Sequence, residues 1–186
     1  MNRKEIEAKL NELDVENYTI NRDGTVDVDG PGGGHVRNLY EIPIQSGKVR
    51  GDFNGSNNKL DSLNGSPQSV GVSFFCHKNL LNSLEGAPRV VGKAFICSFN
   101  LLTSLNGSPP SVNGSFNCSE NRLTSLRGSP DTVNGIFDCS NNKLITLEGI
   151  PKYIKNVLYC SGNNISKETI LHYKKTSSFL IIGDEE

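Results

Sequence analysis

The sequence predicts a solenoid, a fold in which short coils of similar sequence stack along one axis. Two observations predict it: cysteines recur at intervals of 21 residues, and phenylalanine, asparagine and leucine keep the same spacing around them. The cysteines are Cys76, Cys97, Cys118, Cys139 and Cys160. A fixed period of this length is typical of proteins in which each repeat buries its apolar face against its neighbours.

Each repeat is expected to begin with a short strand. A phenylalanine stands two residues before the cysteine in four repeats, Phe53 holds that position one repeat earlier, and Leu158 holds it in the last. The Phe-x-Cys alternation directs both side chains to one face, and stacked repeats would pair the strands into a parallel sheet with a spacing of about 4.8 Å. Phenylalanines, cysteines and two leucine columns should then share one core, where cysteine acts as a small apolar residue.

An asparagine follows every cysteine position by three residues, where the chain turns inward. These asparagines are Asn58, Asn79, Asn100, Asn121, Asn142 and Asn163. Each buried amide can bond backbone groups of its own coil and the next, forming a structural ladder. Losing one such partner should cost about 1–3 kcal/mol. The Gly-x-Pro segment that follows predicts an extended return stretch without a long helix.

The two ends of the chain lack the repeat and are interpreted as caps. Residues 1–34 should form an N-terminal cap with an amphipathic helix over 2–13 and a hairpin over 18–28. The solenoid occupies residues 35–165, and its first repeat is degenerate, with Arg37 in the asparagine position. Residues 166–186 should form a C-terminal cap with a helix over 167–175, a short apolar stretch over 178–182 and a frayed acidic tail over 183–186.

The repeat F-x-C-x-x-N-x-L-x-x-L-x-G-x-P-x-x-V resembles the leucine-rich repeat in its short bacterial form. The resemblance implies a right-handed coil with a parallel β-sheet on the concave face and an irregular convex side. One departure is that positions 71, 92, 113 and 134 hold Gly or Asn where the family has its first leucine.

A second resemblance concerns residues 17–30 together with Ile42-Pro43 and Gly47-Lys48-Val49. This part of the chain is similar to small leucine-rich-repeat proteins of large tailed bacteriophages. It implies a protein made in the cytoplasm of an infected bacterium, and it implies no activity.

Composition excludes several classes of partner and location. The net charge of -1 gives no basic footprint for nucleic acid or an anionic membrane. No apolar run approaches the roughly 20 residues of a membrane span, and the polar N-terminus is unlike a signal peptide. We therefore expect a cytoplasmic protein whose five cysteines are reduced thiols.

The residues that could carry chemistry favour structural interpretations. Cysteines in a straight column cannot surround a metal ion, and they aim poorly for disulfides, so packed core thiols are expected. Asp23, Asp27 and Asp29 fail the calcium-binding loop pattern and are interpreted as a solvated hairpin. The glycine-rich residues 30–35 lack a phosphate-loop ending and are expected to form a flexible loop. We expect no enzyme activity, cofactor or metal, because no nucleophile–base pair can be assembled.

The variable strand positions are the candidate binding surface. Phe75, Ile96 and Phe99 should form an exposed apolar patch in adjacent repeats. The surrounding polar rim and a more distant aromatic complete the expected site: His77, Lys78, Asn117, Glu120, Asp138 and Tyr159. Aromatic anchors with a polar rim are typical of protein interfaces, although scattered surface hydrophobics are the ordinary alternative.

These features favour a non-catalytic scaffold that binds a protein partner on its concave sheet. The partner would be a host factor, such as a component of a defence system, and the scaffold would be a monomer or associate weakly with itself. The alternative is a structural or self-assembling virion protein. A glycan-binding role is disfavoured because Phe75 and Tyr159 lie four repeats apart.

Overall fold

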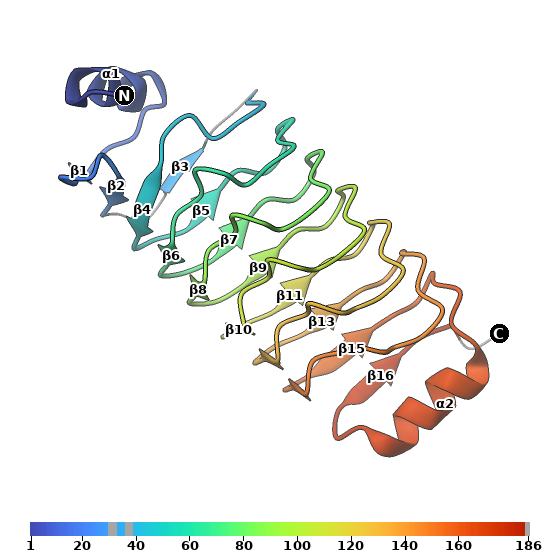
Figure 1. The fold of residues 1–186 in the computed structure, drawn as a ribbon. Helices are drawn as coiled ribbons and strands as arrows, with labels where there is room; N and C mark the ends of the chain where they lie inside the picture. The colour runs from blue at the N-terminus through green and yellow to red at the C-terminus, as the bar shows by residue number, and fades with distance from the viewer. Residues whose placement is uncertain (30–32, 36–38, 185–186) are drawn as a thin grey trace.

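The computed structural model confirms the solenoid and describes residues 1–29, 33–35 and 39–184. The coils stack along one axis, with helix α1 (Arg3–Glu12) at the first end and helix α2 (Lys167–Thr176) at the last (Figure 1). Short, mostly parallel strands run along two sides of the stack, and each coil before the last contributes to both sides. The core therefore lies between two sets of strands.

One side of the stack is an eight-stranded parallel sheet, here called the front sheet. Its order is β16-β15-β13-β11-β9-β7-β5-β3. The strands are β3 (Gly33–His35), β5 (Phe53–Asn54), β7 (Phe74–Phe75), β9 (Phe95–Ile96), β11 (Phe116–Asn117), β13 (Phe137–Asp138), β15 (Val157–Tyr159) and β16 (Leu180–Ile182). Phe74 pairs with Phe53 on one side and Phe95 on the other, as the 21-residue period predicts.

The phenylalanine column forms a continuous stack of rings inside the coils. From Phe53 to Phe137 the centroids of neighbouring rings are 5.2–5.5 Å apart. Such stacked pairs add roughly 0.5–1.5 kcal/mol each beyond the area that they bury. The cysteine and leucine columns of the central coils are fully buried beside the rings. This arrangement confirms the core that the sequence predicts.

The asparagine ladder ties each coil to the coil before it. Asn100 Oδ1 accepts a hydrogen bond from the backbone N–H of Leu81 at 3.1 Å. Its Nδ2 donates to the carbonyl of Cys76 in the preceding coil and to that of Cys97 in its own, both at 3.0 Å. The predicted link to the next coil is therefore wrong, because the inward turn directs the amide back along the stack.

The return side is more regular than the irregular convex surface that the sequence predicts. Its strands form two sheets, β1-β2-β4-β6-β8 and β10-β12-β14. They are β1 (Tyr18–Ile20), β2 (Val26–Val28), β4 (Ser46–Val49), β6 (Ser69–Val70), β8 (Val90–Val91), β10 (Ser111–Val112), β12 (Thr132–Val133) and β14 (Tyr153–Ile154). Parallel pairing joins the valine column, as from Val70 to Val91.

The break between β8 and β10 has a physical cause in Pro110. The equivalent residues Arg89 and Asp131 donate their backbone N–H to the preceding coil, to Gln68 and Pro110 respectively. Proline has no N–H, so the bond to the carbonyl of Arg89 cannot form and the ladder is interrupted there.

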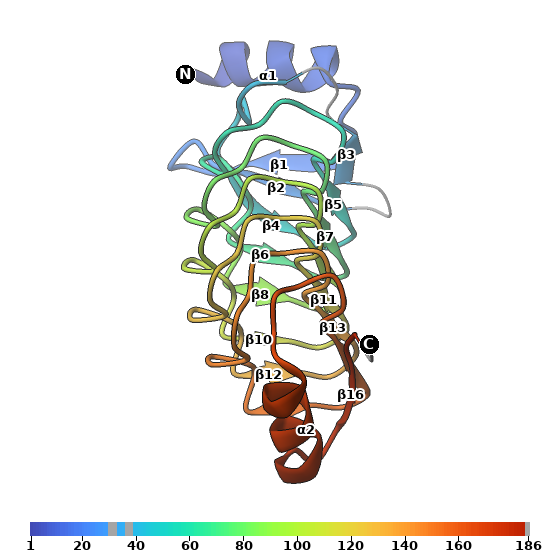
Figure 2. The same cartoon turned by 90° about the vertical axis from the view of Figure 1, so that its right-hand side faces the viewer.

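The N-terminal cap follows the prediction closely. The side chain of Asn2 caps α1 by accepting from the backbone of Glu5, and Ile6 and Leu10 on one helix face are buried. Strands β1 and β2 form the predicted antiparallel hairpin. In Figure 2, α1 lies across the first end of the coils, so it covers core that would otherwise be exposed.

The C-terminal cap combines helix α2 with strand β16. Ser166 caps α2 as predicted, and Ile170 on the helix is buried. β16 pairs in parallel with β15 and is the last strand of the front sheet, and only 1% of Ile181 at its centre is exposed, so β16 extends the buried core past the last coil. Within the described residues, neither helix has the length and apolar character needed to cross a bilayer.

Two predictions for irregular segments are wrong. Gly33–His35 is not a flexible loop but strand β3, which pairs with β5. Asp184 is not frayed, since its carboxylate accepts a hydrogen bond from the backbone N–H of Gly162 at 2.9 Å. The rest of the predicted glycine-rich loop (residues 30–32), Arg37 and residues 185–186 of the tail lie outside the described residues.

Candidate partner-binding surface

The outer face of the front sheet brings two of the predicted anchors together. Phe75 on β7 pairs directly with Ile96 on β9, and both side chains are half-buried. The ring of Phe75 meets the ring of His77 edge-on at 6.2 Å. Since Phe74 and Phe95 fill the core from the opposite face of the same strands, Phe75 and Ile96 are not needed there.

The polar neighbours of these anchors are held in place by the ends of their own strands. Asn117 Oδ1 accepts from the backbone N–H of Ser119 at 2.9 Å, and Asp138 Oδ1 accepts from that of Ser140 at 3.0 Å. Asn117 Nδ2 also donates to Asp138 Oδ2 at 3.3 Å. These two rim residues are therefore preorganised, and part of their hydrogen-bonding capacity is already used.

The third predicted anchor, Phe99, does not lie on the sheet face. It occupies the turn after β9 with a left-handed backbone (φ 55°), and 50% of it is exposed. Lys78 and Glu120 hold the equivalent position in neighbouring coils. The Nζ of Lys78 lies 5.8 Å from the centroid of the Phe99 ring. The structure thus divides the predicted surface into a sheet face and a corner.

His77 lies at the boundary between these two surfaces. Partial burial, helped by the positive charge of Lys78, lowers the pKa of His77 below its ordinary value. Its Nδ1 is buried without a hydrogen-bond partner within the described structure. His77 is therefore neutral near pH 7 and offers an aromatic edge rather than a charge.

A second apolar surface on the same face was not predicted from the sequence. Pairing of β15 with β16 sets Val157 beside Leu180 and Tyr159 beside Ile182. Leu180 is 59% exposed and Ile182 38% exposed. We call this the C-terminal patch: Ile136, Val157, Tyr159, Leu180 and Ile182. The repeat could not reveal it because β16 follows a helix outside the 21-residue frame, although the apolar run 179–182 was a signal.

The five cysteines are free thiols inside the core, as the sequence predicts. Burial raises the pKa of Cys97 well above its ordinary value, and the neighbouring Cys76 raises it further. At the last coil, burial and then the charge of Asp184 raise the pKa of Cys160 to about 11. Thiols of this kind are poor nucleophiles, because the thiolate is the reactive form.

The hairpin carboxylates are each engaged by nearby residues. Asp23 Oδ1 accepts from the backbone N–H of Thr25, Asp27 Oδ1 accepts from that of Lys48, and Asp29 forms an ion pair with Arg50 at 2.7 Å. Among the residues that the structure describes, no three acidic, histidine or cysteine side chains gather as a metal ligand set.

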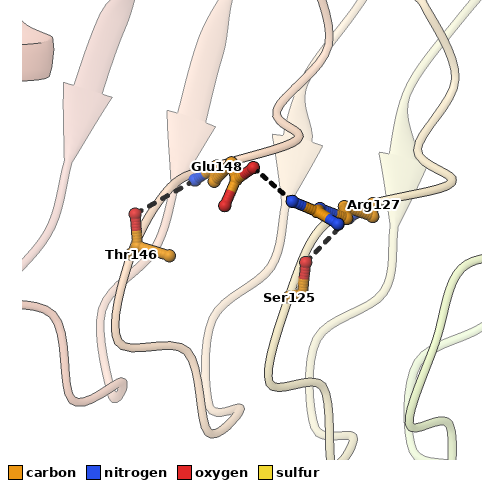
Figure 3. A network of polar contacts seen from close by, with 4 residues as sticks. All are labelled: Ser125, Arg127, Thr146 and Glu148. Carbon is orange, nitrogen blue, oxygen red and sulfur yellow. Dashed lines mark hydrogen bonds and ion pairs between the residues drawn. The ribbon is translucent and has the colours of Figure 1, made fainter.

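The residues that flank the second leucine column form a polar network that stabilises the turns. In each coil a Ser or Thr hydroxyl accepts from the backbone N–H two residues later, as Ser125 does from Arg127 and Thr146 from Glu148 (Figure 3). Arg127 and Glu148 form an ion pair between coils at 2.7 Å. Hydrogen bonding to Glu148 raises the pKa of Arg127, which stays charged. These contacts hold turns together and leave no open reactive group.

Comparison with known protein families found no family model that matches the chain, and comparison with curated proteins found no match.

Proposed function

We propose that the protein is a non-catalytic binding protein that holds a protein partner on the front sheet. One observation carries the proposal: Phe75 and Ile96 sit side by side on the outer face of adjacent strands, where the core does not need them. Large apolar side chains in such positions, with a polar rim, are typical of interaction surfaces.

The C-terminal patch enlarges this surface. Tyr159 and Ile182 continue the column that contains Phe75 and Ile96, with Asn117 and Asp138 between the two apolar regions. A partner that spans the sheet would bury both regions and meet the polar pair in the middle. Apolar anchors inside a polar surround are the usual source of affinity in protein complexes.

The finer identity of the protein belongs to the same proposal. We infer that the coils are leucine-rich repeats of the short bacterial type, which the asparagine ladder and buried leucine columns support. The resemblance of residues 17–30 and 42–49 to phage proteins supports an origin in phage and a host protein, such as a defence factor, as the partner in the bacterial cytoplasm.

The alternative, a self-assembling structural protein, has less support. End-to-end growth of a solenoid needs open end coils, whereas α1 lies across the first coil and β16 and α2 cover the last. Terminal caps of this kind remove the exposed core on which another solenoid could stack. An apparent molar mass that rises with protein concentration, measured by light scattering, would favour the alternative.

The proposal is tested by the double variant Phe75→Ser and Ile96→Ser in affinity capture from bacterial lysate, read by mass spectrometry. A partner held by the wild type should be lost from the variant, while the circular dichroism spectrum is unchanged. The matched control is Val90→Ser with Tyr153→Ser, two exposed apolar residues of the return side. Capture that survives the first variant as well as the control would disprove the proposed surface.

A further inference from the structure

A second surface runs along the corner where the front strands turn toward the leucine columns. It combines exposed cations with exposed apolar side chains. We call it the corner ridge and define it by six residues: Lys59, Lys78, Leu80, Phe99, Arg122 and Lys143. All six are exposed, and Leu80 and Phe99 are about half-exposed at 48% and 50%.

The asparagine ladder is the reason that these side chains point outward. In each coil the asparagine turns inward, so the residues directly before and after it are left on the outside. Lys78 and Phe99 precede ladder asparagines and have the left-handed backbone of the turn. Leu80 follows Asn79, whose backbone N–H donates to the carbonyl of Phe99 at 3.3 Å.

The charge of the ridge contrasts with that of the whole chain. The turn positions directly before and after the ladder asparagines hold these four cations and one acid, Glu120. Their net charge is +3, whereas that of the whole chain is -1. In the described parts of the chain none of the four cations forms a salt bridge. The Nζ of Lys59 instead approaches the Tyr40 hydroxyl at 3.3 Å. Positive charge beside apolar anchors is complementary to an acidic segment with apolar side chains.

The spacing of the ridge favours a helical ligand. One column runs Lys59, Leu80, Leu101, Arg122, Lys143, with one residue in each coil and a coil spacing of about 4.8 Å. Side chains on one face of an α-helix recur every three or four residues, or about 5 Å along its axis. Alternate residues of an extended strand recur at about 6.6 Å and fall out of step.

We propose that the corner ridge binds an acidic amphipathic α-helix of a partner protein. The apolar side chains of the helix lie over Leu80 and Phe99. Its carboxylates lie opposite Lys78 beside these anchors and opposite the cations at the two ends of the ridge. The inference goes beyond the front-sheet proposal and does not depend on it, because Phe75 and Ile96 belong to a different face. A linear ligand is favoured over a membrane because the apolar residues form a narrow column between cations.

The test uses a defined probe, a fluorescein-labelled helical peptide of about 20 residues with leucine and glutamate on one face at helical spacing. Fluorescence anisotropy should show saturable binding. The variant Lys59→Glu, Lys78→Glu, Arg122→Glu, Lys143→Glu should weaken it at least about tenfold, and so should Leu80→Ser with Phe99→Ser. Circular dichroism checks that both variants fold.

Matched controls separate an effect of the ridge itself from an effect of the net charge of the protein. Lys48→Glu, Arg89→Glu, Lys93→Glu, Lys155→Glu makes the same change of charge with exposed residues away from the ridge and should leave binding unchanged. A peptide with lysine in place of glutamate should bind the ridge-reversed variant in preference to the wild type. Phe75→Ser with Ile96→Ser should leave binding of the acidic peptide unchanged. The peptide assay therefore tests the corner ridge independently of the front-sheet proposal.

Three results would overturn the inference. The first is no saturable binding of the acidic peptide to the wild type. The second is binding that the ridge variants leave intact. The third is tighter binding of phosphatidylserine vesicles or single-stranded DNA than of the peptide, which would assign the ridge to a membrane or a nucleic acid.

Discussion

The central coils and the first coil with the full repeat pattern (residues 53–73, here called the first coil) follow the same backbone path but bury different side chains. From Phe74 to Cys139 the ring, cysteine and leucine columns are fully buried. In the first coil Phe53 is 6% exposed and Gly55 stands in the cysteine position, and Ile44 in the degenerate repeat before it is 7% exposed. A cavity of about 50 Å³ lies there among the side chains of Leu10, Ile44 and Phe53.

The difference shows what repetition contributes to stability. A central coil has a neighbour with the same core side chains on each side, so its core residues are packed by the same residue types in every coil. The first coil has one such neighbour and, on its other side, the degenerate repeat, which cannot reproduce the pattern. Because stability in a solenoid sums over neighbouring interfaces, the same change should cost more at the centre than at the first coil.

The largest expected effect is on the asparagine ladder. Asn100→Ala removes the acceptor for Leu81 and the donor to Cys76 and Cys97, all buried, and should destabilise by about 3–5 kcal/mol. Asn58→Ala in the partly buried first position should cost about 1–2 kcal/mol. Urea unfolding followed by circular dichroism measures both.

Exposed Asn82 supplies the control, since Asn82→Ala should change the free energy of unfolding by less than about 0.5 kcal/mol. Equal losses for Asn100→Ala and Asn58→Ala would remove the distinction between the centre and the first coil.

A smaller effect is expected at two glycines with opposite outcomes. At Gly107 the backbone is left-handed (φ +93°) and an added Cβ would collide with the backbone of Leu84, so Gly107→Ala should cost about 2–4 kcal/mol. At Gly55 an added Cβ would lie 3.3 Å from Phe53 Cε1, 3.4 Å from Leu60 Cδ1 and 3.8 Å from the carbonyl oxygen of Phe75, so it requires shifts of only a few tenths of an ångström. Gly55→Ala should therefore stabilise by about 0.5 kcal/mol. A loss of stability at Gly55 would mean that the first coil is as tightly packed as the centre.

The smallest effect concerns thiol reactivity and leaves stability unchanged. In native protein at pH 8, iodoacetamide should modify Cys160 in the last coil at least about tenfold faster than central Cys97, because end coils open locally. Peptide mass spectrometry reads each rate. Asp184→Asn should speed the reaction at Cys160, because the charge of Asp184 raises the pKa of that thiol and so lowers the thiolate fraction. Equal rates at the two cysteines would contradict the prediction.

The repeat made the core predictable at the level of single residues. Phe74, Cys97 and Asn121 could be placed inside because only a shared interior requires the same side chain at a constant interval. Surface positions carry no such constraint. The 21-residue period predicts that Phe75 and Ile96 are neighbours on the sheet. The location of Phe99 depends on the left-handed turn that separates it from the sheet, which the period does not report.

By itself, the sequence determined that the chain is a stack of 21-residue coils with a helix and hairpin at one end, because burial repeats with the period. Only the tertiary structure decided that β16 completes the front sheet and creates the C-terminal patch, and that Lys59, Leu80 and Phe99 share a corner. The physical reason is that periodicity reports which side chains are hidden, while the neighbours of an exposed side chain depend on how turns and caps bring separate segments together.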